Sequence, residues 1–348
     1  MKLAAASAGF LFLISSVTRP AVPAVRSPAP KARQFVFTYR AILRDLPSNA
    51  AKIRIWIPLA TSDAYQTVTL KEATGPVHLR EMRGSAYGNH FMYAELHHPS
   101  SPTAEFTLEY EVTRREYSRG NYASLMKLNA SGSVAPPRVG RFLLPDHLVP
   151  VTGLIRKLAD ETTRGHQGAV DQAYALYNYV FHTLRYDKSG SGWGRGDALW
   201  ACDAKHGNCT DFHSLFIALA RSVKIPARFE IGFPLPEDAH QGAIPGYHCW
   251  AEFYVAGAGW VPVDISEAWQ HPSKHDYFFG TVDANRVSFT RGRDLTLSPR
   301  QDGPPLNYFV YPYVEVDGRA YDKIDRRFSF HDLPAVERAA TRRGAAAR

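Results

Sequence analysis

One cysteine of this chain lies where its chemistry would be favoured. In KHGNCTDFHSLFIALARSV, residues 205–223, Cys209 precedes apolar side chains at helical spacing. That apolar stripe consists of Phe212, Leu215, Phe216, Leu219 and Val223. Asn208 is a suitable N-cap and Asp211 completes an approximate capping box, so we expect a helix with Cys209 in its first turn. The unpaired N–H groups and the dipole of a helix start favour a thiolate and can receive an oxyanion, which makes Cys209 a candidate nucleophile.

A base and a group that orients it follow downstream. The stretch YHCWAEFYVAGAGWVPVDIS, residues 247–266, is typical of a β-hairpin with an AGAG turn. Alternation puts His248, Trp250 and Glu252 on one face, while Cys249 shares the opposite face with apolar residues and is predicted to be core. We expect the hairpin to set His248 beside Asp264, both facing the helix that starts at Cys209. His248 would then accept the thiol proton, and Asp264 would fix the imidazole tautomer.

These segments resemble the transglutaminase-like superfamily of papain-type cysteine enzymes. The matching stretches are GNCTDFHSLFIALARSVKIPARF, HCWAEFYV and GWVPVDIS. The order Cys, His, Asp agrees, as do the separations of 39 and 16 residues and the tryptophan two positions after the histidine. The resemblance covers roughly residues 150–290 and implies catalytic roles for Cys209, His248 and Asp264. Neither Trp193 nor Trp200 aligns with the tryptophan that completes the oxyanion hole in animal transglutaminases.

The same region suggests a competing metal site. Cys202, His206, Cys209 and His213 spell C-x3-H-x2-C-x3-H, and four nitrogen and sulfur ligands would suit zinc. A helix begins between the inner pair, however, and His213 lies off the apolar stripe, so we expect it at the surface or in a cleft. Catalysis is the favoured interpretation. No metal or cofactor is implied, since the chain has no calcium-loop pattern of spaced acids.

The three cysteines, Cys202, Cys209 and Cys249, are an odd number, so at least one is free or pairs between molecules. Cys202 and Cys249 could form a disulfide, which export permits. Cys249 is equally well explained as an inert core residue, and the sequence leaves both possibilities open.

Residues 1–24, MKLAAASAGFLFLISSVTRPAVPA, have the layout of a secretory signal peptide with cleavage after Ala24. The apolar run is too short for a membrane anchor, so we expect an exported protein, periplasmic or secreted, without a membrane span in its mature form.

The formal charge of the chain is +8, and removal of Lys2 and Arg19 with the signal peptide leaves +6. The basic residues are scattered, which favours a solvated basic surface over a nucleic-acid site.

The 348 residues are 45% hydrophobic and 12% aromatic, enough for about two domains. Alternation in AKIRIWIPLA and EFTLEYEVT predicts an antiparallel sheet or sandwich with one wet face, and GAVDQAYALYNYVFHTLRYD has helical spacing. The fold class expected is α+β, with a β-rich, sandwich-like N-terminal domain before a papain-like transglutaminase core. The predicted division is a signal peptide at 1–24, a β-rich domain at 33–116, a linker at 117–150, a catalytic domain at 151–292, a C-terminal β extension at 293–333 and a basic disordered tail at 334–348.

The function expected is an exported cysteine-dependent acyl hydrolase or transferase that acts on amide bonds of a peptide or protein through a thioester. The glycine-rich segment KSGSGWGRGD, residues 188–197, and polar residues around Cys209 predict a flexible lip and a mouth open to water. Such a mouth favours hydrolysis over transfer. The alternatives are a protein-crosslinking transglutaminase and a non-catalytic binding or scaffolding module with the same fold. Substrate identity and oligomeric state do not follow from the sequence.

Overall fold

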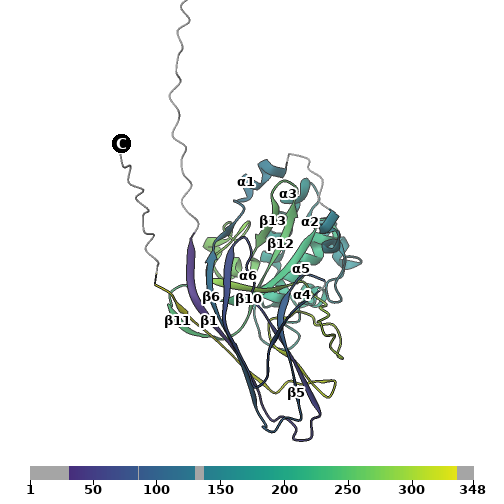
Figure 1. Ribbon diagram of the computed structural model, residues 1–348. Helices are drawn as coiled ribbons and strands as arrows, with labels where there is room; N and C mark the ends of the chain where they lie inside the picture. Colours follow the sequence, from purple (N-terminus) through teal and green to yellow (C-terminus); the bar gives the residue numbers. More distant parts are fainter. Residues whose placement is uncertain (1–30, 85, 130–136, 335–348) are drawn as a thin grey trace, which may run out of the picture.

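The structure of the chain is a computed structural model that describes residues 31–84, 86–129 and 137–334 (Figure 1). The predicted signal peptide lies outside the described residues, as does the predicted basic tail beyond residue 334. In Figure 1 long strands form the lower part of the molecule, and helices gather on the upper right beside a second group of strands. The predicted α+β fold class, with a β-rich N-terminal region, is confirmed.

Two five-stranded antiparallel sheets build the β-rich region, with strand orders β11-β18-β1-β6-β3 and β17-β16-β2-β5-β4. Apolar side chains of both sheets belong to one continuous core. In β6 the predicted alternation is present, because Phe106, Leu108, Tyr110 and Val112 are all buried. The strands of this region are β1 (Ala32–Leu43), β2 (Lys52–Pro58), β3 (Gln66–Thr74), β4 (Arg80–Arg83), β5 (His90–His97), β6 (Ala104–Arg115), β11 (Gln241–Ile244), β16 (Tyr313–Val316), β17 (Arg319–Ala320) and β18 (Ile324–Asp332).

The prediction of one wet face is wrong for β2. Ile55 faces the shared core, yet Trp56 on the opposite face is also fully buried. A second apolar cluster covers that face, in which Leu295, Leu297 and Phe309 come from a late segment of the chain. Burial on both faces therefore depends on residues about 240 positions away, which strand periodicity cannot reveal.

Late strands complete both sheets of the β-rich region. The predicted C-terminal β extension, 293–333, supplies β16, which pairs with β2, and β18, which pairs with β1. The chain thus returns to its starting sheet after it has built the helical part. The segment predicted as a linker, 117–150, contains β7 (Tyr117–Ser118), α1 (Tyr122–Asn129) and the 3-10 helix η1 (Pro137–Leu143).

The helical part is built on a four-stranded antiparallel sheet with the order β13-β12-β10-β15. Helix α5 packs against β12 and β10, and α2, α3 and α4 pack around α5. Every residue of α5 is buried, so this helix is the centre of the layer. The remaining elements are α2 (Leu154–Thr162), α3 (Gly168–Thr183), β8 (Arg185–Tyr186), α4 (Ala198–Ala204), β9 (His206–Gly207), α5 (Cys209–Ser222), β10 (Ala227–Pro234), β12 (His248–Val255), β13 (Gly259–Val263), α6 (Ile265–Gln270), the 3-10 helix η2 (Pro272–Lys274), β14 (Thr281–Val282) and β15 (Arg286–Arg291).

Two predicted local structures are confirmed. The helical spacing around residue 175 corresponds to α3, whose buried side chains include Val170, Ala173, Tyr177 and Val180. The predicted hairpin corresponds to β12 and β13, which pair antiparallel. The turn of this hairpin falls at the AGAG sequence, where the glycine residues were predicted to form it.

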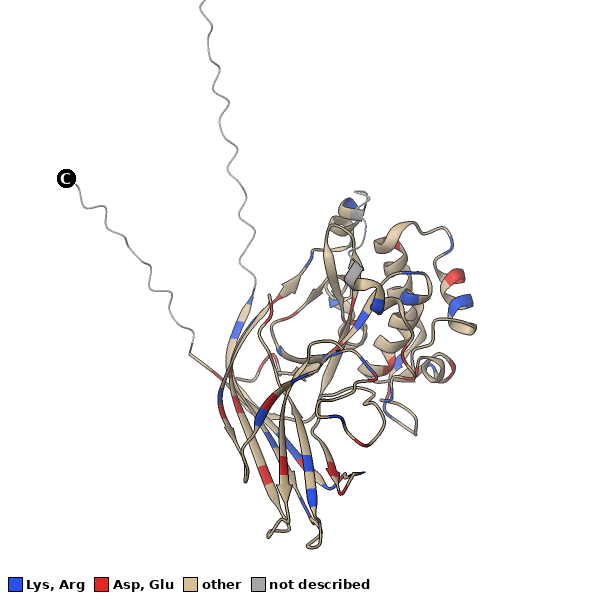
Figure 2. Cartoon of the chain, turned by 45° about the vertical axis from the view of Figure 1, so that its right-hand side comes forward, with Lys and Arg blue, Asp and Glu red and all other residues tan. Residues whose placement is uncertain are grey.

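Charged side chains are spread over both parts of the molecule. Figure 2 shows Lys and Arg interspersed with Asp and Glu along the long strands and over the helices. Within residues 31–84, 86–129 and 137–334, no helix combines the length and the apolar character needed to cross a membrane.

A substitution at Gly232 tests how tightly β10 packs between β15 and β12, the strand that carries His248. Gly232 lies opposite His248 in the β10–β12 register, and a Cβ atom there would lie 1.9 Å from the Val287 carbonyl oxygen of β15. Gly232→Ala should therefore push β15 away and lower the free energy of unfolding by about 1–3 kcal/mol. Gly140→Ala is the control, because a Cβ at Gly140 meets nothing within 4 Å. Urea unfolding measures both variants, and equal midpoints would contradict the account.

Candidate active site

Helix α5 begins at Cys209, as predicted, and the capping box is present. The Asn208 side chain accepts a hydrogen bond from the Thr210 N–H at 2.9 Å, and the Asp211 carboxylate accepts one from the Asn208 N–H at 2.9 Å. Cys209 is only 2% exposed. No acceptor for the backbone N–H of Cys209 is found among the described residues, so this first-turn donor is free to bind an oxyanion.

The three candidate residues are brought together. His248 is the first residue of β12, and its Nε2 lies 2.7 Å from Oδ2 of Asp264, which follows the last residue of β13. The imidazole also hydrogen-bonds to the Cys209 thiol. Because Nε2 is occupied by Asp264, Nδ1 is the ring nitrogen available to sulfur. Cys209, His248 and Asp264 thus form one hydrogen-bonded chain across α5, β12 and β13.

The electrostatics of this chain favour charge separation. Burial alone would raise the pKa of the Cys209 thiol, but hydrogen bonds from Cys249 and His248 and the His248 charge outweigh burial and lower the pKa well below its ordinary value. Burial opposes the charge of His248, but the charge and hydrogen bond of Asp264, with the contribution of Cys209, raise the pKa of the imidazole well above its ordinary value. A thiolate–imidazolium pair is therefore the favoured form near neutral pH.

Asp264 is fully buried and holds more than the imidazole. Its Oδ2 also accepts a hydrogen bond from Arg286 Nη1 at 2.8 Å, and its Oδ1 accepts from the Glu267 N–H at 3.2 Å as the N-cap of α6. Burial raises the pKa of Asp264, but the charges of His248 and Arg286 reverse this and keep it well below its ordinary range. Arg286 is in turn paired with Asp283 at 3.2 Å. Sequence reasoning missed Arg286, since nothing in its local pattern indicates a link to Asp264.

The predicted orientation of the hairpin is only partly right. Cys249 and Phe253 face α5, where Phe253 packs against Phe216. Trp250 lies on the opposite face, in a cluster with Tyr117. His248 shares the face of Trp250 and still reaches Cys209, because it stands at the end of β12, beside the start of α5.

A second buried thiol contacts the first. Cys249 hydrogen-bonds to Cys209, and its sulfur lies 3.8 Å from Thr210 Oγ1. All three cysteines are free thiols, so the structure contains no Cys202–Cys249 disulfide. Burial, followed by the neighbouring Cys209, raises the pKa of Cys249, which keeps it protonated and able to donate to the Cys209 thiolate. Cys249 is therefore part of the site, although the sequence suggested only a disulfide partner or an inert core residue.

His213 was expected at a surface or in a cleft, and this is wrong. The side chain is fully buried, its Nε2 accepts a hydrogen bond from the Ile265 N–H at 3.0 Å, and its Nδ1 lies 3.7 Å from the Cys249 sulfur. Burial lowers the pKa of His213 to about 4, so the ring is neutral at pH 7. Within the described part of the chain, no group of three or more His, Cys, Asp and Glu side chains is arranged to hold a metal ion.

The prediction that the glycine-rich segment at residues 188–197 is flexible is also wrong for the second half of that segment. The Asp211 carboxylate accepts hydrogen bonds from the N–H groups of Gly194 at 2.7 Å and Gly196 at 2.9 Å. Arg293 donates to the Gly196 carbonyl at 2.8 Å, and Tyr308 to the Gly194 carbonyl at 3.2 Å. Because this loop is held and the Cys209 thiol is buried, the prediction of a mouth open to water is not supported by the geometry around the sulfur.

Two tyrosines that the sequence did not single out contact the residues around the start of α5. The pKa of Tyr186 is raised by burial and then by the negative charges of its neighbours, with Cys209 the first of them. Tyr247 donates to or accepts from Thr210 Oγ1 at 2.7 Å, and it accepts from Asn208 Nδ2 at 3.1 Å, so it braces the start of α5. Trp200 packs instead on Gly192 and the ring of His206. Tyr186 pairs with Gly207, two residues before Cys209, and its ring centroid lies 6.2 Å from that of Phe212 in α5, which makes it a better candidate than Trp193 or Trp200 for a second oxyanion donor.

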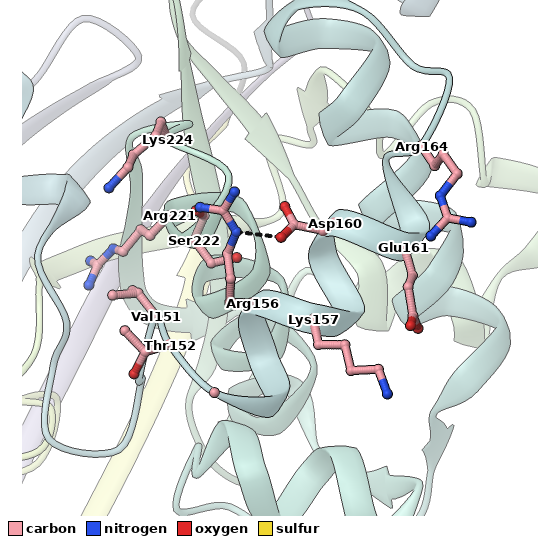
Figure 3. A pocket seen from close by; sticks show the side chains of 11 residues that line it. Val151, Thr152, Arg156, Lys157, Asp160, Glu161, Arg164, Arg221, Ser222 and Lys224 are labelled. Atoms are coloured by element: carbon pink, nitrogen blue, oxygen red, sulfur yellow. Dashed lines mark hydrogen bonds and ion pairs between the residues drawn. The ribbon is translucent and has the colours of Figure 1, made fainter.

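A cavity of about 590 Å³ lies at the other end of α5 (Figure 3). Its lining includes Ser222 and Lys224 from that end and Arg156 and Asp160 from α2, which form an ion pair drawn in the figure. None of its lining residues belongs to the Cys–His–Asp chain.

Comparison with known proteins shows what the helical part of this chain is similar to. Residues 156–265 match the family model of the transglutaminase-like superfamily. An uncharacterized protein of Haemophilus influenzae is 26% identical over 333 residues, covering 84% of this chain and 88% of that protein. The uncharacterized protein YebA of Bacillus subtilis is 26% identical over 145 residues, which are 38% of this chain and 19% of YebA. The crystal structure of a candidate cysteine protease from Cytophaga hutchinsonii has a TM-score of 0.51 at 15% identity and covers 87% of this chain and 98% of that one, which indicates a shared fold.

The charge-separated pair predicts an unusual pH dependence of thiol alkylation. An ordinary cysteine, with a pKa of roughly 8.5, loses reactivity about tenfold for each pH unit below that value. Because the pKa of Cys209 is lowered and that of His248 raised, the alkylation rate of Cys209 by iodoacetamide should change less than about tenfold between about pH 5.5 and 8.5.

His248→Gln is the matched control, since it removes the imidazolium and should restore the ordinary tenfold rise per pH unit. Peptide mass spectrometry separates Cys209 from Cys202 and Cys249. A wild-type rate that rises tenfold per pH unit would show that no thiolate–imidazolium pair exists.

Proposed function

Because residues 156–265 match the family model of the transglutaminase-like superfamily, we propose that this protein is a cysteine-dependent hydrolase that cleaves amide bonds of peptides or proteins. The observation that carries the proposal is the hydrogen-bonded chain from Cys209 through His248 to Asp264 at the start of a buried helix. In the first step the Cys209 thiolate attacks the amide carbonyl carbon, and the carbonyl oxygen takes the negative charge.

Each neighbour has a place in that step. The free N–H of Cys209 and the hydroxyl of Tyr186 would donate to the oxyanion, whose charge develops only in the transition state. His248 would deliver its Nδ1 proton to the leaving amine as the C–N bond breaks, leaving a thioester on Cys209. Asp264 would stabilise the imidazolium and hold its tautomer, and Arg286 would fix the position of Asp264.

Water is the proposed acceptor of the acyl group. The side chain of Glu267, which is 24% exposed, reaches within 4.0 Å of His248 Nε2 and gives the imidazole a polar connection to solvent. In the second step neutral His248 would take a proton from water, the hydroxide would attack the thioester, and the acid and the thiolate–imidazolium pair would result. Transfer to an amine uses the same thioester, so protein crosslinking remains the alternative reaction.

The place of action is proposed from the N-terminal sequence. The apolar segment and small-residue exit of residues 1–24 support export, with the mature enzyme acting on peptides or proteins outside the cytoplasm. The non-catalytic alternative, a scaffold that retains the fold, differs in having an unreactive Cys209 thiol.

Product analysis tests hydrolysis directly. Purified protein is given a glutamine-containing peptide library together with a fluorescent primary amine, and products are identified by mass spectrometry. We expect new free acid, from side-chain deamidation or backbone cleavage, to exceed amine incorporation, and Cys209→Ala to form neither product. Predominant amine incorporation would reassign the reaction to crosslinking, and the absence of both products, with an unreactive thiol, would favour the scaffold.

Substitutions of Asp264 and Asp283 distinguish an effect on catalysis from an effect on stability. Both carboxylates pair with Arg286, but only Asp264 contacts His248. Asp264→Asn should lower kcat/KM by about two to four orders of magnitude, since the amide cannot stabilise the imidazolium. It should also lower the melting temperature, because Arg286 loses its buried partner. Asp283→Asn is the control, and it should lower the melting temperature while kcat/KM stays within about tenfold. Equal losses of kcat/KM in the two variants would contradict a direct role for Asp264.

A further inference from the structure

Arg114 is a buried arginine that forms no ion pair with a carboxylate among the described residues. Its side chain is 2% exposed, it makes one hydrogen bond, to Gln66 Oε1 at 3.3 Å, and its Nε has no partner. No carboxylate pairs with it among residues 31–84, 86–129 and 137–334. An unpaired buried cation is costly, so some group should offset the charge of Arg114 when the site is in use.

The other four buried arginines have their donors satisfied. Arg54 pairs with Glu315, Arg221 with Asp146, and Arg286 with Asp264 and Asp283, while Arg293 donates to Gly196 O, Arg195 O, Ser214 Oγ and Asn307 Oδ1. Burial lowers the pKa of Arg114, whereas in Arg286 the two carboxylates overcome the burial and raise it. Burial also lowers the pKa of Arg293, whose partners are neutral oxygens, so the unpartnered Nε is what distinguishes Arg114 from Arg293.

The Arg114 side chain lines a cavity of about 180 Å³ between the β-rich region and the β12 sheet. Trp250 and Glu252 of β12 are buried in its lining, while Arg119 is exposed. The walls are aromatic. The Tyr65 and Tyr117 rings stack with centroids 3.7 Å apart, and the Arg119 guanidinium lies over both.

The charges of the lining define the ligand. Four arginines and three acids line the cavity, which leaves one positive charge in excess. The acids are already engaged: Glu230 pairs with Arg291 at 2.8 Å, Glu252 with Arg228, and Asp63 accepts from two backbone N–H groups. One carboxylate matches this excess charge and the planar fork of a guanidinium, whereas a doubly charged anion would leave the cavity with a net negative charge.

We propose that this cavity binds a ligand with a single carboxylate, held by Arg114, on a planar or apolar group that packs against Tyr65, Tyr117 and Trp260. The site is distinct from the Cys–His–Asp chain and does not require the proposed hydrolase activity. Trp250 connects the two, since it lines the cavity and its ring lies 6.4 Å from that of His248.

The basic cavity of Figure 3 provides a contrast. Its buried arginine, Arg221, already pairs with Asp146 at 2.7 Å, and Arg156 pairs with Asp160 at 2.7 Å. Nothing in that cavity requires an added anion. Arg156 is therefore a suitable control for the removal of one arginine charge.

Benzoate and benzamide test the proposal with the full protein, because they share a shape and differ in charge. Binding is measured by NMR titration of the tryptophan indole N–H signals. We expect benzoate to bind at least about tenfold more tightly than benzamide and to shift the signals of Trp250 and Trp260, since a charged hydrogen bond contributes more than a neutral one. Arg114→Gln should reduce the ratio to about one, and Arg156→Gln should leave it unchanged.

Three results would overturn the proposal: equal binding of the two compounds, benzoate binding that shifts neither indole signal, or an unchanged ratio in Arg114→Gln. The variant should fold, since it removes an unpaired buried charge, and its melting temperature should equal or exceed that of the wild type. If Arg114→Gln nevertheless fails to fold, the comparison of the two compounds on the wild-type protein decides the question.

Discussion

The buried carboxylate of Asp264 is the constraint on which the rest of the site depends. It holds His248 on β12, Arg286 on β15 and the first turn of α6, and it does so without exposure to water. A carboxylate in this position must be satisfied by charged or hydrogen-bonding partners, or the fold would lose stability. The same requirement fixes the imidazole next to Cys209, so the geometry proposed for catalysis and the stability of the sheet have a common origin.

A second carboxylate plays the matching role on the other side of the thiol. Asp211 is the capping-box residue of α5, and it also holds the backbone of Gly194 and Gly196. The helix start and the loop in front of it are therefore fixed by one side chain. Cys209 lies between these two supports, Asp211 from its own helix and Asp264 through His248, which gives the thiolate a preorganised environment.

Local patterns in the sequence predicted much of this arrangement, and long-range contacts account for what they missed. The N-cap at Asn208 and the hairpin carrying His248 are short-range features, so periodicity and turn residues identified them. The contact of Arg286 with Asp264, and the burial of His213, depend on how α5, β12 and β15 pack, which no local pattern encodes. The buried second face of Trp56 likewise depends on a segment near the end of the chain. The position of Asp264 was predicted, but its ion pair with Arg286 was not.

The central claim is that Cys209 and His248 form a thiolate–imidazolium pair, and nitrogen NMR of His248 tests it most directly. With the histidines labelled with nitrogen-15, the ring shifts report whether one or both nitrogens carry protons. The account predicts that both His248 nitrogens are protonated at pH 7, whereas His213 is neutral because the pKa of its buried ring is lowered to about 4. A neutral His248 ring at pH 7 would contradict the account.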